Sequence, residues 1–253
     1  MSELLTRRRL ITTGLAAAAG ASGLAVAARL ADRYSLIPPD HRGLFGAGET
    51  LTYAAHRILT AHHSLAREFE RSQISKVIPV NGKHPEVESY QRLQAGGFAD
   101  WRLTIDGLVA RPSSFSLADL KRFPVHSQIT HQACEEGWSF IAEWTGARLS
   151  DVLNVVGVQP QAKWVFFFTI DQWWDSLDIP DALHPQTFLA YGMNGQEMPL
   201  DHGAPVRLKV ARQLGYKSLK YLSRITVTDT MKNIGDGLGS GSPSTGYSWY
   251  AGI

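Results

Sequence analysis

Cys134 is the only cysteine among the 253 residues of this chain, so no internal disulfide can stabilise its fold. A lone thiol can be a buried apolar filler, an intermolecular crosslink, a nucleophile or a metal ligand. The first fate is the commonest, but here the cysteine lies in a polar and glycine-containing string, His-Gln-Ala-Cys-Glu-Glu-Gly-Trp-Ser, from His131 to Ser139. This setting favours a chemical role for the thiol.

The N-terminus has the features of an export signal. Three arginines, Arg7 to Arg9, precede a mild apolar run from Leu10 to about Ala28, and Ala25-Val26-Ala27 would serve as a cleavage site. The arginines and the weak hydrophobicity of the run resemble a twin-arginine signal, which exports folded proteins. We therefore expect residues 1–30 to direct the chain, folded, to the periplasm. The alternative is an uncleaved membrane anchor.

The remaining chain has the composition of one globular domain. The whole sequence is 44% hydrophobic and 19% charged, with a net charge of +2, and no basic stripe suggests nucleic-acid binding. We expect an N-terminal extension with a helix over 31–72 and a single domain over 73–253, because no internal repeat or shift in composition marks a second one.

Short elements alternate irregularly along the domain. The apolar spacing predicts helices over 51–69, with Thr50 as N-cap, and over 149–156, and a short capped helix after Ser116. Strands are predicted over 101–107, 127–133, 164–170, 207–211 and 223–228, and residues 235–246 form a Gly/Ser loop. The run at 164–170 is continuously apolar, which fits a strand buried on both faces. This mixture favours an α+β fold.

Three histidines on the first predicted helix could suggest a metal site. His62 and His63 are adjacent and point to different helix faces, which favours solvated side chains over metal ligands, and we interpret them and His56 as solvated.

A basic cluster follows in the last third of the chain. His202-Gly-Ala-Pro-Val-Arg207 is followed by Gly-Tyr-Lys-Ser-Leu-Lys, which ends at Lys220. Glycine allows close backbone approach, an arginine can grip an anion with two hydrogen bonds, and Ser218 can contact its oxygens. The cluster therefore predicts a phosphate site, with surface charge on a hairpin as the alternative. There is no P-loop or Rossmann glycine motif, so nucleotide binding has little support.

Together these strings resemble the sulfite-oxidase-type molybdopterin-binding domain, in particular the stand-alone exported bacterial members. The matching strings are Cys-Glu-Glu-Gly-Trp-Ser, Trp-Thr-Gly at 144–146, Leu-Ala-Tyr-Gly-Met-Asn-Gly at 189–195, and the two basic strings. They occur in the family's order between about Ser75 and Asp229. The resemblance implies an α+β domain with mixed β-sheets and short helices.

The resemblance also implies a cofactor, molybdenum with one molybdopterin. Cys134 would bind the metal through its thiolate, a soft donor, and complete a centre otherwise held by the dithiolene sulfurs. The other positions that match cofactor contacts are Asn81, His84, Thr169, His202, Arg207, Ser218, Leu219 and Lys220. His202 stands where some relatives have asparagine, and Arg207 with Ser218 to Lys220 matches the grip on the terminal phosphate.

The implied activity is two-electron oxygen-atom transfer on a small molecule. His131, Trp138, Asp171 and Asp178 are candidates for the substrate pocket because they lie near the ligand cysteine or Thr169 in sequence. The simpler alternative is that Trp138 packs and the aspartates cap turns. Sulfite-oxidising members tend to have an arginine before the cysteine where this chain has His131-Gln-Ala, so reduction of a neutral sulfoxide or related oxide is favoured over sulfite oxidation.

Electrons must be exchanged with a separate protein, since a chain with one cysteine has no haem-attachment motif or iron–sulfur ligand set. We expect a membrane haem subunit or a c-type cytochrome as this partner. Two other classes of function remain open. One is a cofactor-free binding module, which would not need the thiol, and the other is a cysteine-nucleophile enzyme with His131 or His202 as base.

Overall fold

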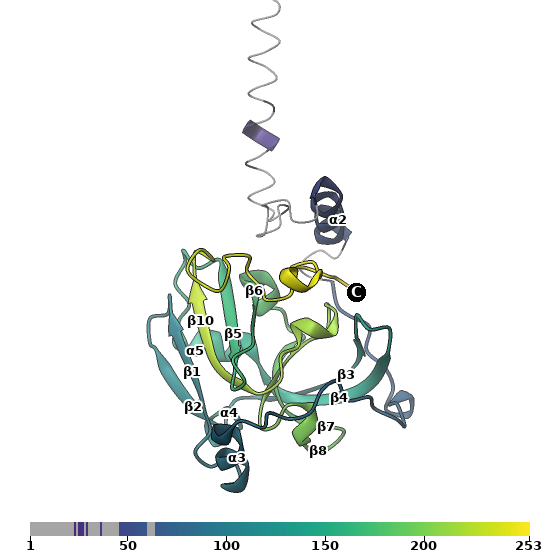
Figure 1. The fold of residues 1–253 in the computed structure, drawn as a ribbon, viewed down its shortest axis with the longest axis vertical. Helices are drawn as coiled ribbons and strands as arrows, with labels where there is room; N and C mark the ends of the chain where they lie inside the picture. Colours follow the sequence, from purple (N-terminus) through teal and green to yellow (C-terminus); the bar gives the residue numbers. More distant parts are fainter. Residues whose placement is uncertain (1–22, 24, 28, 30–35, 37–45, 60–63) are drawn as a thin grey trace, which may run out of the picture.

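The computed structural model describes residues 23, 25–27, 29, 36, 46–59 and 64–253, and it has the α+β architecture expected from the sequence (Figure 1). The strands are β1 (Arg102–Gly107), β2 (Ser113–Ser116), β3 (Val125–Ala133), β4 (Ser139–Arg148), β5 (Trp164–Thr169), β6 (Trp174–Asp178), β7 (Thr187–Met193), β8 (Gln196–Glu197), β9 (Arg207–Val210) and β10 (Leu222–Thr228). The α-helices are α2 (Gly46–Leu59), α3 (Glu88–Ala95), α4 (Leu117–Leu120), α5 (Leu149–Val156) and α6 (Ile179–Ala182). Among these residues no helix is both long and apolar enough to cross a membrane.

One five-stranded sheet has the order β2-β1-β10-β5-β6, in which only the β1–β10 pair is parallel. Strand β5, which lies between β10 and β6, is buried on both faces, as the apolar run predicted. Val165 and Phe167 belong to the main core with β1, β10 and α5, whereas Phe166 packs on the other face with Tyr53 of α2 and Trp249. The main core thus covers one face of β5, and α2 and the C-terminal segment cover the face that carries Phe166.

The other sheet has the order β3-β4-β7-β8, with β9 pairing on β7. β3 and β4 form a long hairpin that ends at the pair Ala133–Ser139, so the five residues 134–138 form its loop and carry the cysteine. A Cβ atom at Gly146 would lie 2.2 Å from the Leu189 carbonyl oxygen. Glycine is therefore needed for β4 to approach β7 at the bulge between Thr145 and Gly146.

The helix expected over 51–69 differs from the structure. α2 starts earlier, at Gly46, and ends at Leu59, and residues 60–63, including His62 and His63, lie outside the described residues. Residues 64–69 are extended because their backbone bonds to other segments: Ala66 exchanges two hydrogen bonds with the Gln186 amide, and Phe69 N donates to Ile129 O of β3. Tertiary hydrogen bonds have outweighed the helical spacing of the apolar residues here.

Candidate active site: a cavity between the sheets

One cavity of about 470 Å³ collects most of the site residues that the sequence predicted. It lies where the β3–β4 loop, the turn after β5, and the segments that lead into β9 and β10 meet. The predicted residues that line it are Asn81, Cys134, Trp138, Thr169, Asp171, His202, Arg207, Ser218, Leu219 and Lys220. Residues that are up to 139 positions apart in sequence thus surround a single space.

Cys134 is held in a tight loop at the tip of the β3–β4 hairpin. Its backbone N donates to Trp138 O at 2.9 Å, and Gly137, with a φ of 91°, allows the reversal. The side chain is buried, with Glu135 Oε2 3.5 Å and Asn81 Nδ2 4.0 Å from Sγ. Burial, reinforced by the Glu135 charge, raises the pKa of the Cys134 thiol to about 11. This is the opposite of an activated nucleophile, whose thiolate needs a nearby positive charge.

Arg207 and Lys220 form the cationic part of the cavity. The buried Arg207 guanidinium donates to Ser218 O at 2.7 Å and to His202 O at 3.0 Å, and it lies 4.9 Å from the centre of the Trp144 ring. Burial lowers the pKa of Arg207 to about 10, and burial followed by the Arg207 charge lowers the pKa of Lys220 to about 8.

Lys220 also connects the two ends of the site. Its Nζ donates to Asn81 O at 2.6 Å and to Asp201 O at 2.9 Å. The lysine thereby fixes the backbone of Asn81, whose side-chain amide lies next to Cys134 Sγ. Within the described residues, the hydrogen bonds of Arg207 and Lys220 go to carbonyl oxygens and not to a carboxylate. Two cations without a carboxylate partner favour binding of an anion.

Two glycines allow these groups to approach one another. A Cβ at Gly203, where φ is +114°, would lie 3.0 Å from both Arg207 Cβ and Lys220 Cβ. A Cβ at Gly215 would lie 2.7 Å from the Gln132 amide nitrogen and 3.0 Å from Ala133 O. The first glycine therefore lets the cations approach, and the second lets the Gly-Tyr-Lys-Ser turn approach the end of β3 next to Cys134.

Two polar residues of the cavity are constrained by their neighbours. The Thr169 hydroxyl accepts from Trp173 N at 2.9 Å and donates to the Asp171 carboxylate, which fixes the turn after β5. Burial, followed by the Arg207 and Lys220 charges, lowers the pKa of His202 to about 4, so this imidazole is neutral at pH 7. A neutral imidazole keeps one ring N–H to donate, the group through which the resemblance implies a contact with the pterin.

The described residues provide no complete metal site of their own, since no three His, Cys, Asp or Glu side chains converge among them. A metal at Cys134 would need further donors from a bound cofactor. The geometry thus combines one thiol donor, an anion-binding pair of cations and a large cavity.

The comparisons with known proteins agree with this combination. Residues 90–234 match the family described as the oxidoreductase molybdopterin binding domain. The chain belongs to this family. It is 33% identical over 190 residues, 75% of the chain and 69% of the relative, to an Azospira oryzae protein named as a protein-methionine-sulfoxide reductase subunit, YedZ1. The sulfane dehydrogenase SoxCD of Paracoccus pantotrophus is structurally similar, with a TM-score of 0.50 and 28% identity over 52% of this chain.

Family membership confirms the resemblance inferred from the sequence, the fold class and the classification as a molybdopterin-binding oxidoreductase. The chain spans only 39% of the sulfane dehydrogenase chain. The residues of this cavity fit such a cofactor: the cations without a carboxylate partner suit its phosphate, and a metal cation would favour the thiolate form of Cys134.

Three residues predicted for the site do not line the cavity. His84 is held aside by Asp201, whose Oδ1 lies 2.7 Å from His84 Nδ1. His131 lies on β3, where its carbonyl accepts from the buried Lys209, and its ring lies 6.5 Å from that of Phe69. Asp178 is the N-cap of α6 and forms a buried ion pair with Arg57 of α2. Asp178 thus caps a helix, the structural role given as the alternative for the aspartates.

Several cavity residues were missed by the sequence analysis. They include the acidic Glu135 and four aromatic side chains, Trp173, Tyr216, Tyr221 and Tyr247. Tyr221 follows Lys220 directly, has a φ of 58°, and is buried with no hydrogen-bond partner for its hydroxyl among the described residues. Tyr221 and Glu135 could have been predicted from the sequence, because each directly follows a residue of a matching string, Lys220 and Cys134 respectively. No local pattern indicated Tyr247.

Proposed function

We propose that the chain is an exported oxidoreductase that holds one molybdenum and one molybdopterin in this cavity and reduces a sulfoxide-like substrate. The observation that carries the proposal is the single cavity shared by Cys134 and the Arg207–Lys220 pair. The bound cofactor would supply two-electron oxygen-atom transfer. In the overall reaction a sulfoxide takes up two electrons and two protons and yields a sulfide and water.

Each end of the cavity has a distinct task in this proposal. Cys134 would hold the metal, and Arg207, Lys220 and Ser218 would hold the phosphate through charge-assisted hydrogen bonds. Asn81 and the neutral His202 would bind the pterin between them. Leu219 and Thr169 line the same space and would contact the cofactor by packing and through the hydroxyl oxygen.

The charges around Cys134 favour a neutral substrate over sulfite. The carboxylate of Glu135 lies 3.5 Å from Sγ and would repel an anion, whereas both lining cations are already assigned to the phosphate. Trp138 and Trp173 add apolar surface to the cavity that suits the alkyl groups of a sulfoxide. The name of the Azospira relative points to the same substrate class.

Electrons would come from a separate protein, and the word "subunit" in the relative's name supports such an assembly. A membrane haem subunit and a c-type cytochrome are the two candidates. Export would follow the twin-arginine route through Arg7 to Arg9, with the cofactor inserted before translocation because that route carries folded proteins.

The proposal is tested on protein purified after export. Metal and pterin analysis should give about one molybdenum and one molybdopterin per chain, and a chemically reduced dye should drive reduction of a neutral methyl sulfoxide. A metal-free preparation with full activity would refute the cofactor assignment. Faster turnover of sulfite with an oxidant than of the sulfoxide would refute the assigned direction and substrate.

A further inference from the structure

The C-terminal residues 238–253, here called the strap, form part of the wall of the cavity. Ser242, Thr245 and Tyr247 line it, although the strap lies beyond the family-matched residues 90–234. In Figure 1 the strap is the yellow segment above β10 and β5. The sequence predicted only a Gly/Ser loop for most of this stretch, so its contribution to the site comes from the structure alone.

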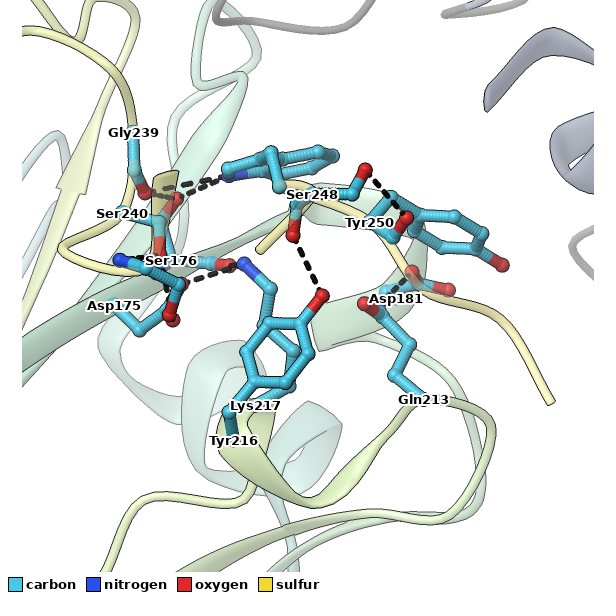
Figure 2. A network of polar contacts seen from close by, with 12 residues as sticks. Asp175, Ser176, Asp181, Gln213, Tyr216, Lys217, Gly239, Ser240, Ser248 and Tyr250 are labelled. Atoms are coloured by element: carbon cyan, nitrogen blue, oxygen red, sulfur yellow. Dashed lines mark hydrogen bonds and ion pairs between the residues drawn. The ribbon is translucent and has the colours of Figure 1, made fainter. Parts of the chain in front are cut away.

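A buried ionic clasp holds the strap in place (Figure 2). Asp175 of β6 accepts from Lys217 Nζ through Oδ1 at 2.5 Å, and its Oδ2 accepts from Ser240 Oγ at 2.7 Å and from Ser242 Oγ at 3.2 Å. Both charged side chains are only 1% exposed. Lys217 Nζ also donates to Ser176 O at 3.0 Å, so the charges of this pair are well satisfied.

Aromatic side chains make further contacts between the strap and the residues around the clasp. The Lys217 ammonium lies 4.8 Å from the centre of the Trp249 ring, and the indole N–H of Trp249 donates to Ser176 Oγ at 2.9 Å. Tyr216 donates its hydroxyl to Ser248 O at 2.6 Å and stacks on Tyr247 with ring centres 5.4 Å apart. The strap is therefore held on both sides of its turn at Pro243–Thr245: at Ser240 and Ser242 before the turn, and at residues 247–249 after it.

Some of the residues that fix the strap belong to the segment that forms the anion site. Tyr216 and Lys217 directly precede Ser218, and Leu214 N bonds to Ala251 O at 3.0 Å. In the segment 214–220, residues 214–217 contact the strap, and residues 218–220 form part of the anion site. A displacement of the strap would open the cavity wall and loosen the Ser218–Lys220 stretch together.

We propose that the strap is the retaining wall of the cofactor cavity and that Asp175 and Lys217 are positioning residues that hold it closed. The inference rests on the proposed location of the cofactor. Neither residue lines the cavity, so an effect on cofactor retention would act through the strap. A purely structural pair would instead lower the stability of the whole domain without a specific effect on cofactor release.

The test uses the holoenzyme and two matched variants. Ser240→Ala removes the hydroxyl-to-carboxylate bond of the clasp, and with it the bond that this hydroxyl accepts from Ser242 N, without replacing a lining residue. Thr226→Val removes a similar hydroxyl-to-carboxylate bond, 2.6 Å to Asp106 Oδ1, in β10. Release of pterin on dilution should be roughly tenfold faster in Ser240→Ala, the effect of losing one hydrogen bond to a charged group. Thr226→Val should release it at the wild-type rate.

Limited proteolysis gives a second readout. The exposed Lys232 precedes the strap, and trypsin should cleave after it sooner in Ser240→Ala than in the wild type. The paired variant Asp175→Asn/Lys217→Met, which leaves no unpaired charge, should show both effects more strongly. Equal pterin release from wild type, Ser240→Ala and the paired variant would refute the inference, as would equal effects in Thr226→Val. A wild-type protein without pterin would instead refute the proposed function.

Discussion

Replacing Arg207 with methionine should weaken cofactor binding while changing the stability of the apoprotein little. Burial lowers the pKa of this arginine from 12.5 to about 10. At about 1.4 kcal/mol per pKa unit, keeping the charge inside the apoprotein costs about 3 kcal/mol. Because the folded pKa lies below the unfolded one, this cost is fully present at pH 7 and declines only as the pH rises through 10.

The substitution also removes favourable contacts of similar size. Arg207 donates to the carbonyl oxygens of His202 and Ser218, and each bond to a charged group contributes about 1.5–3 kcal/mol. The two effects oppose each other, so we expect the free energy of unfolding of the apoprotein to change by no more than about 3 kcal/mol. The cofactor would lose its bonds from the guanidinium, with an affinity loss of roughly tenfold to a hundredfold.

Three measurements check this expectation: urea unfolding of the apoprotein, molybdenum and pterin content, and turnover per bound molybdenum. Content should fall and turnover per molybdenum should stay near that of the wild type. Arg224→Met is the control, because Arg224 is exposed and its guanidinium contacts Phe168 outside the cavity. Unchanged content with a large loss of apoprotein stability would show that Arg207 has only a structural role, and a collapse of normalised turnover would place it at the substrate.

Three further predictions concern other parts of the chain. Cys134→Ser should abolish the sulfur-to-metal charge-transfer absorption and nearly all turnover, because an alkoxide is a harder donor than a thiolate; retained absorption would exclude Cys134 as the ligand. The affinity of the apoprotein for inorganic phosphate should fall as the pH rises through about 8, where Lys220 loses its charge, and a titration that is flat up to pH 9 would contradict this. Changing Arg7, Arg8 and Arg9 together to lysine should leave folded precursor in the cytoplasm, and normal arrival in the periplasm by cell fractionation would show that the signal is not of the twin-arginine type.

Local patterns identified much of the fold and part of the site. The helix at 149–156 and the capped turn after Ser116 follow from apolar spacing and a capping box, and both are confirmed. The strand before Cys134 is also confirmed, which places the thiol on a loop at the hairpin tip. The basic strings bring Arg207 and Lys220 to one cavity, because the glycines within them permit close approach.

The remaining features depend on partners that are distant in sequence. Asp178 looked like a pocket residue, but its partner Arg57 lies 121 positions away on an N-terminal helix. Asp175 and Lys217 are 42 positions apart, and neither carries a local signal that would pair them. Residues 235–246 are rich in glycine and serine, a composition that predicts a loop but not which surface the loop covers. Such pairings are set by the packing of the sheets and not by neighbouring residues.

The position of β10 has a consequence for the order of events during synthesis. It is the last strand in sequence, yet it lies in the middle of its sheet, between β1 and β5. The β1–β2 and β5–β6 hairpins emerge from the ribosome first, and an isolated two-stranded hairpin is at best marginally stable in water. The sheet can close only after residues 222–228 have been made, and the segment that leads into β10 carries the anion site. Loading of the proposed cofactor would therefore follow the synthesis of residues 222–228 and, on the proposed export route, precede translocation of the folded protein.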